Sequence, residues 1–520
     1  MYNRLLLSLA LCILCTVNSL TFASTTKLAG TKLTFEQHQI TAPFKVSLPV
    51  IAVDLLSDGK SPTDELVIIG EDEEQQTWLA VYAFNEPENK FLLLDKLPLA
   101  DKYFAFDVGE EQQELYFLSK NEVVSLNYRE EQSHGDSMQS ALHLQHKQNI
   151  SSIFLQNKSS FIAKKDFIQD VNKDGFDDII LPDFEHTNLW LAAKESQEYI
   201  YQALAINTRV ELSRGGVFFN PLTLFFADLT LDKQQDIAWV SKGEINYFSQ
   251  LEDGTFSSEQ KTLLIADAIH GLDWWQIRES DGENLDQSNL THRVIEEVKD
   301  INGDGLIDVV VRFTQSSGVL ERANDYEFYL GFSNKAGQLE FPKIANTVIK
   351  AEGTLTGLNI IDVNNDGKFE VLLSSFELSI SNIIGALMSG GIDQNVLLFV
   401  LNDQNIYSND SVISKEVELS FSLSSGQSGQ PIVLLSDVNG DELEDLILSS
   451  GEEELKIYLG QNSSRLFNRK ASKHELLLPK DGELFEHFDI NHDGKKDFIM
   501  RYGRLDDESM ANQLSILMVK

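Results

Sequence analysis

The stretch DINGDGLIDVVVRF, residues 300–313, joins a short Asp-rich loop to a strand-like run. Its first nine residues follow the pattern Asp-x-Asn-x-Asp-Gly-x-x-Asp, and the run that follows is rich in β-branched residues, which favours a β-strand. The same pattern returns in DVNKDGFDD (170–178), DVNNDGKFE (362–370), DVNGDELED (437–445) and DINHDGKKD (489–497). This recurrence predicts a repeat architecture.

Three weaker copies complete the series: DLLSDGKSPTDE (54–65), which carries an insertion, DVGEEQQEL (107–115) and DLTLDKQQD (228–236). The eight copies start 52 to 75 residues apart, with a period near 60. Each loop precedes a strand-like run, and hairpin-like runs fill the remainder of the period. Four short strands per repeat predict β-propeller blades, which bury their faces only against neighbouring blades.

Eight copies predict an all-β propeller of eight four-stranded blades, with seven as the alternative if the divergent first units are not full blades. The segments TKLTFEQHQI (31–40) and QLSILMVK (513–520) both read as strands. We expect them to complete one blade together, because a closed ring leaves no exposed edge. The predicted propeller covers residues 24–520.

Residues 1–23 read as a secretory signal peptide, with Arg4, an apolar run over residues 5–17 and a small-residue cleavage site ending at Ala23. Both cysteines, Cys12 and Cys15, lie inside this segment. No later stretch has the length of a transmembrane segment. We therefore expect export to the periplasm or the extracellular space, with a mature chain free of cysteine.

The chain is strongly acidic, with 42 Lys+Arg against 81 Asp+Glu and a formal net charge of -39. Such a charge repels phosphate backbones, so the composition argues against nucleic acid as a partner. Self-repulsion of this size also destabilises a compact fold unless bound cations offset it. The acidic residues of the repeated loop are the obvious place for such cations.

The loop pattern places carboxylate or amide oxygens at positions 1, 3, 5 and 9, and glycine at position 6 allows a sharp turn. Calcium prefers six to eight oxygen ligands, while the absence of His and Cys at these positions disfavours zinc and copper. An EF-hand is excluded because position 12 is apolar in all five good copies. We predict four to five calcium sites, with these side-chain ligands: Asp170, Asn172, Asp174 and Asp178; Asp300, Asn302, Asp304 and Asp308; Asp362, Asn364, Asp366 and Glu370; Asp437, Asn439, Asp441 and Asp445; Asp489, Asn491, Asp493 and Asp497.

Two alternatives accompany this prediction. The Asp side chains could instead form Asx-turns at the tips of hairpins, where Asp, Asn and Gly are common. The site beginning at Asp437 is the weaker of the five because Glu442 replaces the glycine, and the loops beginning at Asp54, Asp107 and Asp228 are expected to hold no metal.

These repeats resemble the FG-GAP/VCBS repeats of integrin-α-like β-propellers. The likeness rests on DINGDGLIDVVVRF and on FYLGFSNKAGQLEF (328–341), which match the two halves of that unit. It implies a calcium-bearing propeller whose Asp-rich loops connect the first two strands of each blade. The resemblance does not determine a function.

Functional loops are often insertions on a rigid scaffold. The two longest intervals contain residues 274–293 and 376–395, which we expect to project from the face opposite the Asp-rich loops. No nucleophile, zinc or phosphate-binding motif is present. The sequence thus favours a non-enzymatic binding or scaffold module for a protein or glycan ligand. The alternative is a calcium-dependent, lyase-like polysaccharide enzyme, which a cleft with Lys, Arg, His or Tyr beside paired carboxylates would favour.

Overall fold

A computed structural model describes residues 33–520, except 57–62, 111–112, 130–140, 155–161, 194–195, 214–215, 242, 266–268, 270–289, 319–320, 351–353, 377–390 and 423–426. The signal peptide predicted over residues 1–23 lies outside this range. The structure is nearly all β, with 2% helix. Its described helices are the 3-10 turns η1 (Glu86–Glu88), η3 (Gly482–Leu484) and η4 (Glu508–Met510).

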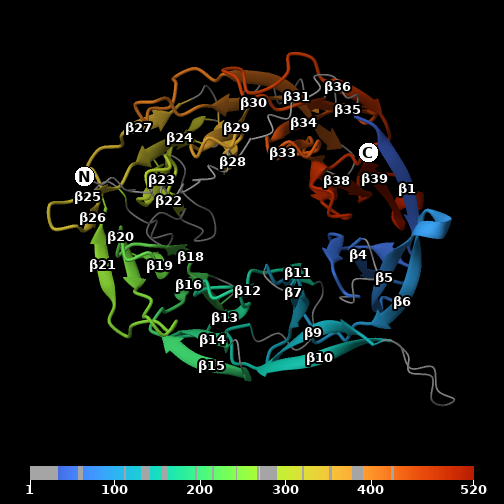
Figure 1. Cartoon of the computed structure of the whole chain (residues 1–520), viewed down its shortest axis with the longest axis horizontal. Coiled ribbons are helices and arrows are strands. Elements are labelled where there is room, and N and C mark those ends of the chain that lie inside the picture. Colours follow the sequence, from blue (N-terminus) through green and yellow to red (C-terminus); the bar gives the residue numbers. More distant parts are fainter. Residues whose placement is uncertain are drawn as a thin grey trace, which may run out of the picture.

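Eight sheets, antiparallel except for the parallel pairing of β11 with β7, form a closed ring, so the eight-blade prediction is confirmed and the seven-blade alternative is wrong (Figure 1). We number the blades along the chain. Blade 1 contains β2 (Lys45–Val46), β3 (Ile51–Val53), β4 (Glu65–Glu71), β5 (Thr77–Asn85) and β6 (Lys90–Pro98); blade 2 contains β7 (Ala105–Val108), β8 (Leu115–Leu118), β9 (Glu122–Tyr128), β10 (Leu142–Asn149) and β11 (Ala163–Lys164). Blade 3 contains β12 (Ile168–Gln169), β13 (Asp178–Pro182), β14 (Thr187–Ala193) and β15 (Ser196–Leu204); blade 4 contains β18 (Leu224–Ala227), β19 (Asp236–Ser241), β20 (Glu244–Phe248) and β21 (Lys261–Leu264).

The second half of the chain supplies the other four blades. Blade 5 contains β22 (Leu290–Lys299), β23 (Asp308–Gly318), β24 (Glu321–Tyr329) and β27 (Thr347–Ile349); blade 6 contains β28 (Thr354–Ile361), β29 (Glu370–Phe376), β30 (Gly391–Phe399), β31 (Ile413–Ser422) and β32 (Gln427–Gly429). Blade 7 contains β33 (Val433–Ser436), β34 (Asp445–Ser450), β35 (Glu454–Tyr458) and β36 (Ser472–Glu475); blade 8 contains β37 (Phe485–Phe488), β38 (Asp497–Arg501), β39 (Gln513–Val519) and β1 (Phe35–Thr41).

The first and last strands share blade 8, as predicted. Strand β1 pairs antiparallel with β39, in a register that runs from Phe35 opposite Val519 to Thr41 opposite Gln513. Figure 1 shows β1, in blue, beside the red strands of the C-terminal region. This pairing gives β39 a partner on both sides and closes the ring.

The hydrophobic core is divided among the junctions between blades. Ile68 of β4 belongs to the same buried cluster as Ile499 of blade 8, whereas the adjacent Ile69 belongs to a cluster with Phe117 of blade 2. The second strand of a blade is therefore buried on both faces, which explains why the run after each Asp-rich loop is continuously apolar. Eight such clusters among the described residues each join two neighbouring blades.

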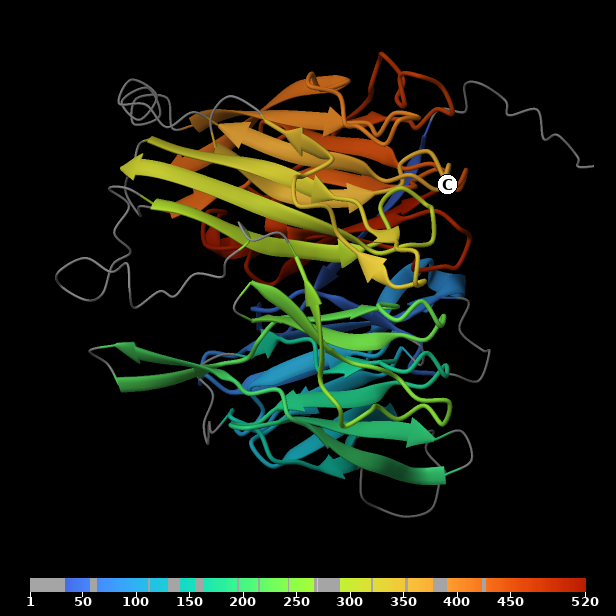
Figure 2. The same cartoon turned by 90° about the vertical axis from the view of Figure 1, so that its left-hand side faces the viewer.

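Two hairpins add to the blades: β16 (Arg209–Ser213) with β17 (Gly216–Asn220), and β25 (Phe332–Ser333) with β26 (Leu339–Glu340). The β16–β17 hairpin lies between blades 3 and 4 and projects beyond the neighbouring strands (Figure 2). In the described part of the chain, no helix is long and apolar enough to cross a membrane.

Candidate functional site

Each Asp-rich segment connects the innermost strand of a blade to its second strand. This is the arrangement that the repeat resemblance implied. Because the blades share one strand order, all eight loops emerge on the same face of the ring. We call this the loop face, and we number each loop from its first Asp.

The loops of blades 3 to 8 share one backbone conformation, with positive φ at positions 4 and 6. Glycine at position 6 meets this requirement in four of them. In blades 7 and 4 the residue is instead Glu442, with φ of 64°, or Lys233, with φ of 70°. A side chain in this region costs about 1 kcal/mol, so these two loops keep the turn despite a local steric penalty.

The carboxylates at positions 1 and 5 shape the turn by accepting backbone N–H groups. In blade 5, Asp300 accepts from Gly305 at 2.8 Å, and Asp304 accepts from Leu306 at 2.9 Å. The equivalent two bonds are present in blades 3, 4, 6, 7 and 8. These bonds are what the Asx-turn alternative requires. They do not exhaust the ligand capacity of the carboxylates, because each oxygen carries two lone pairs.

The carboxylate at position 9 is buried and ties the loop to the blade. Asp308 accepts the N–H of Ile301 at 3.0 Å through one oxygen and that of Gly331 at 2.8 Å through the other. Burial raises its pKa to about 7 against the opposing effect of these N–H bonds, with Asp304 and Asp300 adding to the rise. Burial likewise raises the pKa of the equivalent groups in blades 3 and 7, Asp178 to about 8 and Asp445 to about 7.

Oγ1 of Thr230, in the blade 4 loop, is buried without a partner, and in the five loops predicted to bind calcium three oxygens lack the hydrogen-bond donor that buried acceptors normally find. They are the side-chain amide oxygens of Asn364 and Asn439, both at position 3, and Oε1 of Glu370, at position 9. Glu370 is only 1% exposed, and its other oxygen accepts the N–H of Val363 at 2.9 Å. An acceptor that is buried without a donor is suited to a cation, so these residues fit the predicted metal.

Nevertheless, among the residues that the structure describes, no three His, Cys, Asp or Glu side chains gather as a ready metal-binding group. Each of the five predicted loops has three carboxylates, at positions 1, 5 and 9, and several of their oxygens accept backbone N–H groups. The remaining candidate ligands are Asn side chains and the carbonyl of position 7. Calcium binding therefore stays a prediction for the five loops.

Backbone hydrogen bonds connect neighbouring loops around the ring. The N–H of Phe369, in blade 6, donates to the carbonyl of Ile301, in blade 5, at 2.9 Å. The same kind of bond, from position 8 of one loop to the beginning of the previous loop, joins blade 7 to blade 6 and blade 8 to blade 7, and an equivalent bond from Asp64 joins blade 1 to blade 8. The loops of these five blades thus form one connected band.

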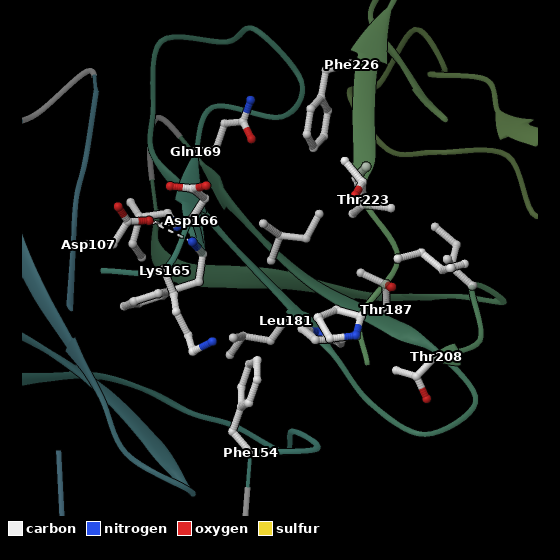
Figure 3. Close-up of a pocket in the computed structure, with 18 of the residues that line it drawn as sticks. Asp107, Phe154, Lys165, Asp166, Gln169, Leu181, Thr187, Thr208, Thr223 and Phe226 are labelled. Atoms are coloured by element: carbon white, nitrogen blue, oxygen red, sulfur yellow. Dashed lines mark hydrogen bonds between the residues drawn. The ribbon is translucent and has the colours of Figure 1, made fainter. Parts of the chain in front are cut away.

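A cavity of about 700 Å³ lies where blades 2, 3 and 4 meet, lined by segments near β11, β12, β14 and β18 (Figure 3). Asp107 borders it, with a carboxylate that accepts the N–H groups of Phe167 at 2.7 Å and Ile168 at 2.8 Å. Burial raises the pKa of Asp107 to about 6 against these N–H bonds. The first position of this divergent loop therefore holds backbone N–H groups of the next blade.

Two charged side chains of the cavity, Lys165 and Asp166, extend in different directions (Figure 3). The ammonium group of Lys165 lies 4.6 Å from the centre of the Phe154 ring. In Figure 3 the side chain of Lys165 extends toward Phe154, whereas the carboxylate of Asp166 points toward the other end of the cavity. The ammonium group of Lys165 and the carboxylate of Asp166 therefore face different regions of the cavity (Figure 3).

The cavity was not anticipated from the sequence. The segments that we expected to carry function, 274–293 and 376–395, fall mostly outside the described residues, which include only their ends in β22, β29 and β30. The cavity instead draws Gln169 and Thr187 from blade 3 and Thr223 from the connection before β18. These residue types are common and belong to no motif, so no signal in a single sequence distinguishes them.

Comparison with known proteins supports the repeat. A family model described as an FG-GAP-like repeat matches residues 300–373, from the loop of blade 5 into β29 of blade 6. No curated protein matches the sequence.

Solved structures with similar folds include a periplasmic gluconolactonase from Pseudomonas aeruginosa, with 14% identity, coverage of 69% of this chain and 86% of that one, and a TM-score of 0.32. A putative 6-phosphogluconolactonase from Bacteroides fragilis has 9% identity, coverage of 84% and 96%, and a TM-score of 0.32. The WD40 domain of SCAP from fission yeast has 11% identity, coverage of 82% and 96%, and a TM-score of 0.30. These scores are too low to bear on function.

Proposed function

We propose that this FG-GAP-repeat β-propeller is an exported binding module whose blades are stabilised by calcium. The observation that carries the proposal is the set of buried acceptors without donors: the amide oxygens of Asn364 and Asn439 and Oε1 of Glu370. Leaving such atoms unpaired costs free energy, and a cation in the loop would remove that cost.

Electrostatics support the same conclusion. The loop carboxylates repel one another, and the charges of Asp304 and Asp300 accordingly add to the rise in the pKa of Asp308. A divalent cation among them would replace repulsion by attraction, in a chain whose formal net charge is -39. Calcium modules outside cells bind at about 10⁻⁴ to 10⁻³ M, which suits export to the periplasm or the extracellular space.

The role of the bound ions would be structural. The loops of blades 5 to 8 and 1 are joined by backbone hydrogen bonds, so an ion that orders one loop also orders its neighbours. The ligand would be a protein or a glycan, held by the rigid ring. A binding role is supported over the lyase-like alternative because Lys165 and Asp166 point to different regions of the cavity (Figure 3).

Thermal unfolding with calcium, with magnesium and with a chelator tests the proposal. Calcium should raise the Tm by several degrees over the chelated sample, and magnesium should have a smaller effect because it demands a smaller octahedral site. Calorimetric titration of the chelated protein should give four to five sites. An identical Tm in calcium and in chelator would overturn the structural role.

A further inference from the structure

The cavity between blades 2, 3 and 4 is lined by a buried threonine whose hydroxyl group has no hydrogen-bond partner in the described part of the protein. Thr187, at the beginning of β14, is only 4% exposed and lines the cavity. Its side chain makes no hydrogen bond with the described part of the protein. The hydroxyl oxygen is not among the fully buried polar atoms that lack a partner, so it remains accessible to a molecule that enters the cavity.

Two other uncommitted polar side chains border the same space. Gln169 ends β12 and Thr223 immediately precedes β18, and neither side chain hydrogen-bonds to other described residues. In Figure 3 the side chains of Gln169, Thr187 and Thr223 surround one opening from different directions. The cavity therefore offers several donors and acceptors to one bound molecule, from rigid positions.

Apolar surfaces lie between these polar groups. The rings of Phe226 and Phe154 stand at opposite ends of the cavity, and Leu181 lies between them (Figure 3). Flat apolar surfaces flanked by short hydroxyl and amide groups suit molecules that have apolar faces and hydroxyl-bearing edges. Sugar rings have this character.

The charges of the lining disfavour an ionic ligand. Lys164 and Lys165 are balanced by Asp107, Glu110 and Asp166, and the carboxylate of Asp107 is already held by backbone N–H groups. The formal net charge of -39 repels anions at long range. An uncharged ligand therefore fits the cavity better than an acidic one.

The backbone around the cavity disfavours an extended peptide. Peptides that bind by strand addition need a long unpaired edge, whereas the edge strands that border the cavity, β11, β12 and β18, are only two, two and four residues long. We infer that this cavity binds a short, uncharged oligosaccharide, and that the Thr187 hydroxyl is one of its recognition groups. The inference rests on the proposed binding function and names its ligand class.

The test is calorimetric titration of the full chain, in calcium, with cellotriose, maltotriose, xylotriose and mannotriose, and with trigalacturonate as the charged comparator. At least one neutral trisaccharide should bind. Thr187→Val, which keeps the shape and removes the hydroxyl, should weaken that binding about tenfold. Thr187→Ser should restore it to within about twofold. Thr356→Val, in β28 of blade 6, is the matched control and should bind as the parent does.

The outcomes separate this inference from the proposed function. Calcium-dependent Tm is recorded on the same samples, so a calcium effect without binding of any neutral sugar overturns the inference alone. Sugar binding that Thr187→Val leaves unchanged would also overturn it, as would tighter binding of trigalacturonate. A Thr187-dependent affinity for peptides from a random library, in place of sugars, would overturn the ligand class. Loss of the calcium effect on Tm would count against the proposed function instead.

Discussion

His492, in the loop of blade 8, lies with its Nε2 atom 2.9 Å from Oδ1 of Asp64, in the loop of blade 1. The two residues are separated by 428 positions in the sequence. The backbone N–H of Asp64 also donates to the carbonyl of Ile490 at 2.8 Å. The contact therefore fastens the last blade to the first on the loop face, at the junction where the ring closes.

Replacing His492 by Ala should weaken this closure slightly. The imidazole side chain is 56% exposed, so the expected loss in the free energy of unfolding is below about 1 kcal/mol. Equilibrium denaturation in urea measures the loss. His143→Ala, in β10, is the control and should change less. If the free energy of unfolding fell by several kcal/mol, the His492 side chain would contribute more to closing the ring than the backbone pairing of β1 with β39 does.

Asn364→Ala should have opposite effects with and without calcium. In chelator, the change removes a buried acceptor that has no donor, so the Tm should stay the same or rise. In calcium, the change removes a ligand, so the Tm should fall and one site should disappear from a calcium titration. The control is Asn302→Ala, because Asn302 accepts the N–H of Asp304 at 2.9 Å and its loss should lower the Tm in both conditions. If the Tm of Asn364→Ala fell in chelator but not in calcium, the assignment of Asn364 as a calcium ligand would be contradicted.

The chelated protein should become less stable as the pH rises from about 5.5 to about 8. Burial raises the pKa of Asp178 to about 8, and of Asp308 and Glu486 to about 7. Between their ordinary pKa values and these raised values, the folded state holds more protons than the unfolded state. The free energy of unfolding therefore falls with rising pH. Thermal unfolding over this range measures the slope, and calcium should reduce or reverse it by favouring the charged carboxylates. A Tm that rises with pH in chelator would show that these groups are not protonated in the fold.

Glu442→Gly should stabilise the loop of blade 7 by about 0.5 to 1 kcal/mol in chelator. Glu442 has φ of 64°, a conformation that glycine adopts without steric cost. Lys233→Gly, at the same position in blade 4, where φ is 70°, should act in the same direction. Urea denaturation of both variants provides the measurement, and destabilisation in both would show that these side chains contribute more than their backbones cost.

The number of blades and the way they close could be predicted because both depend on local, repeated signals. Each Asp-rich loop marks one blade, and even the divergent copies at Asp54 and Asp107 lie in complete blades. The short additional strands β3, β11 and β32 left no such signal, because two or three residues carry no periodicity. The β16–β17 hairpin was also missed, because it lies within an interval of ordinary length.

The candidate sites also contain features that the sequence predicts and features that it does not. The turn-forming contacts of Asp300 and Asp304 follow from a pattern within nine residues. The environment of Asn364, with its unpaired amide oxygen, depends on how tightly the loop is covered, which spacing alone does not give. The cavity is harder still to predict, because Gln169, Thr187 and Thr223 come together only after blade 3 and the connection before β18 are in place.

The pairing of β1 with β39 also imposes an order of events on the growing chain. Thr41 donates a hydrogen bond to Gln513, which is 472 residues later. A chain that leaves the ribosome or a membrane channel from its N-terminus must therefore keep β1 unpaired until almost everything else has emerged. Bringing such distant segments together is slow. Until then, the unpaired strand β1 can pair with strands of other chains. A chaperone would therefore prevent the most aggregation by covering β1 before the ring closes.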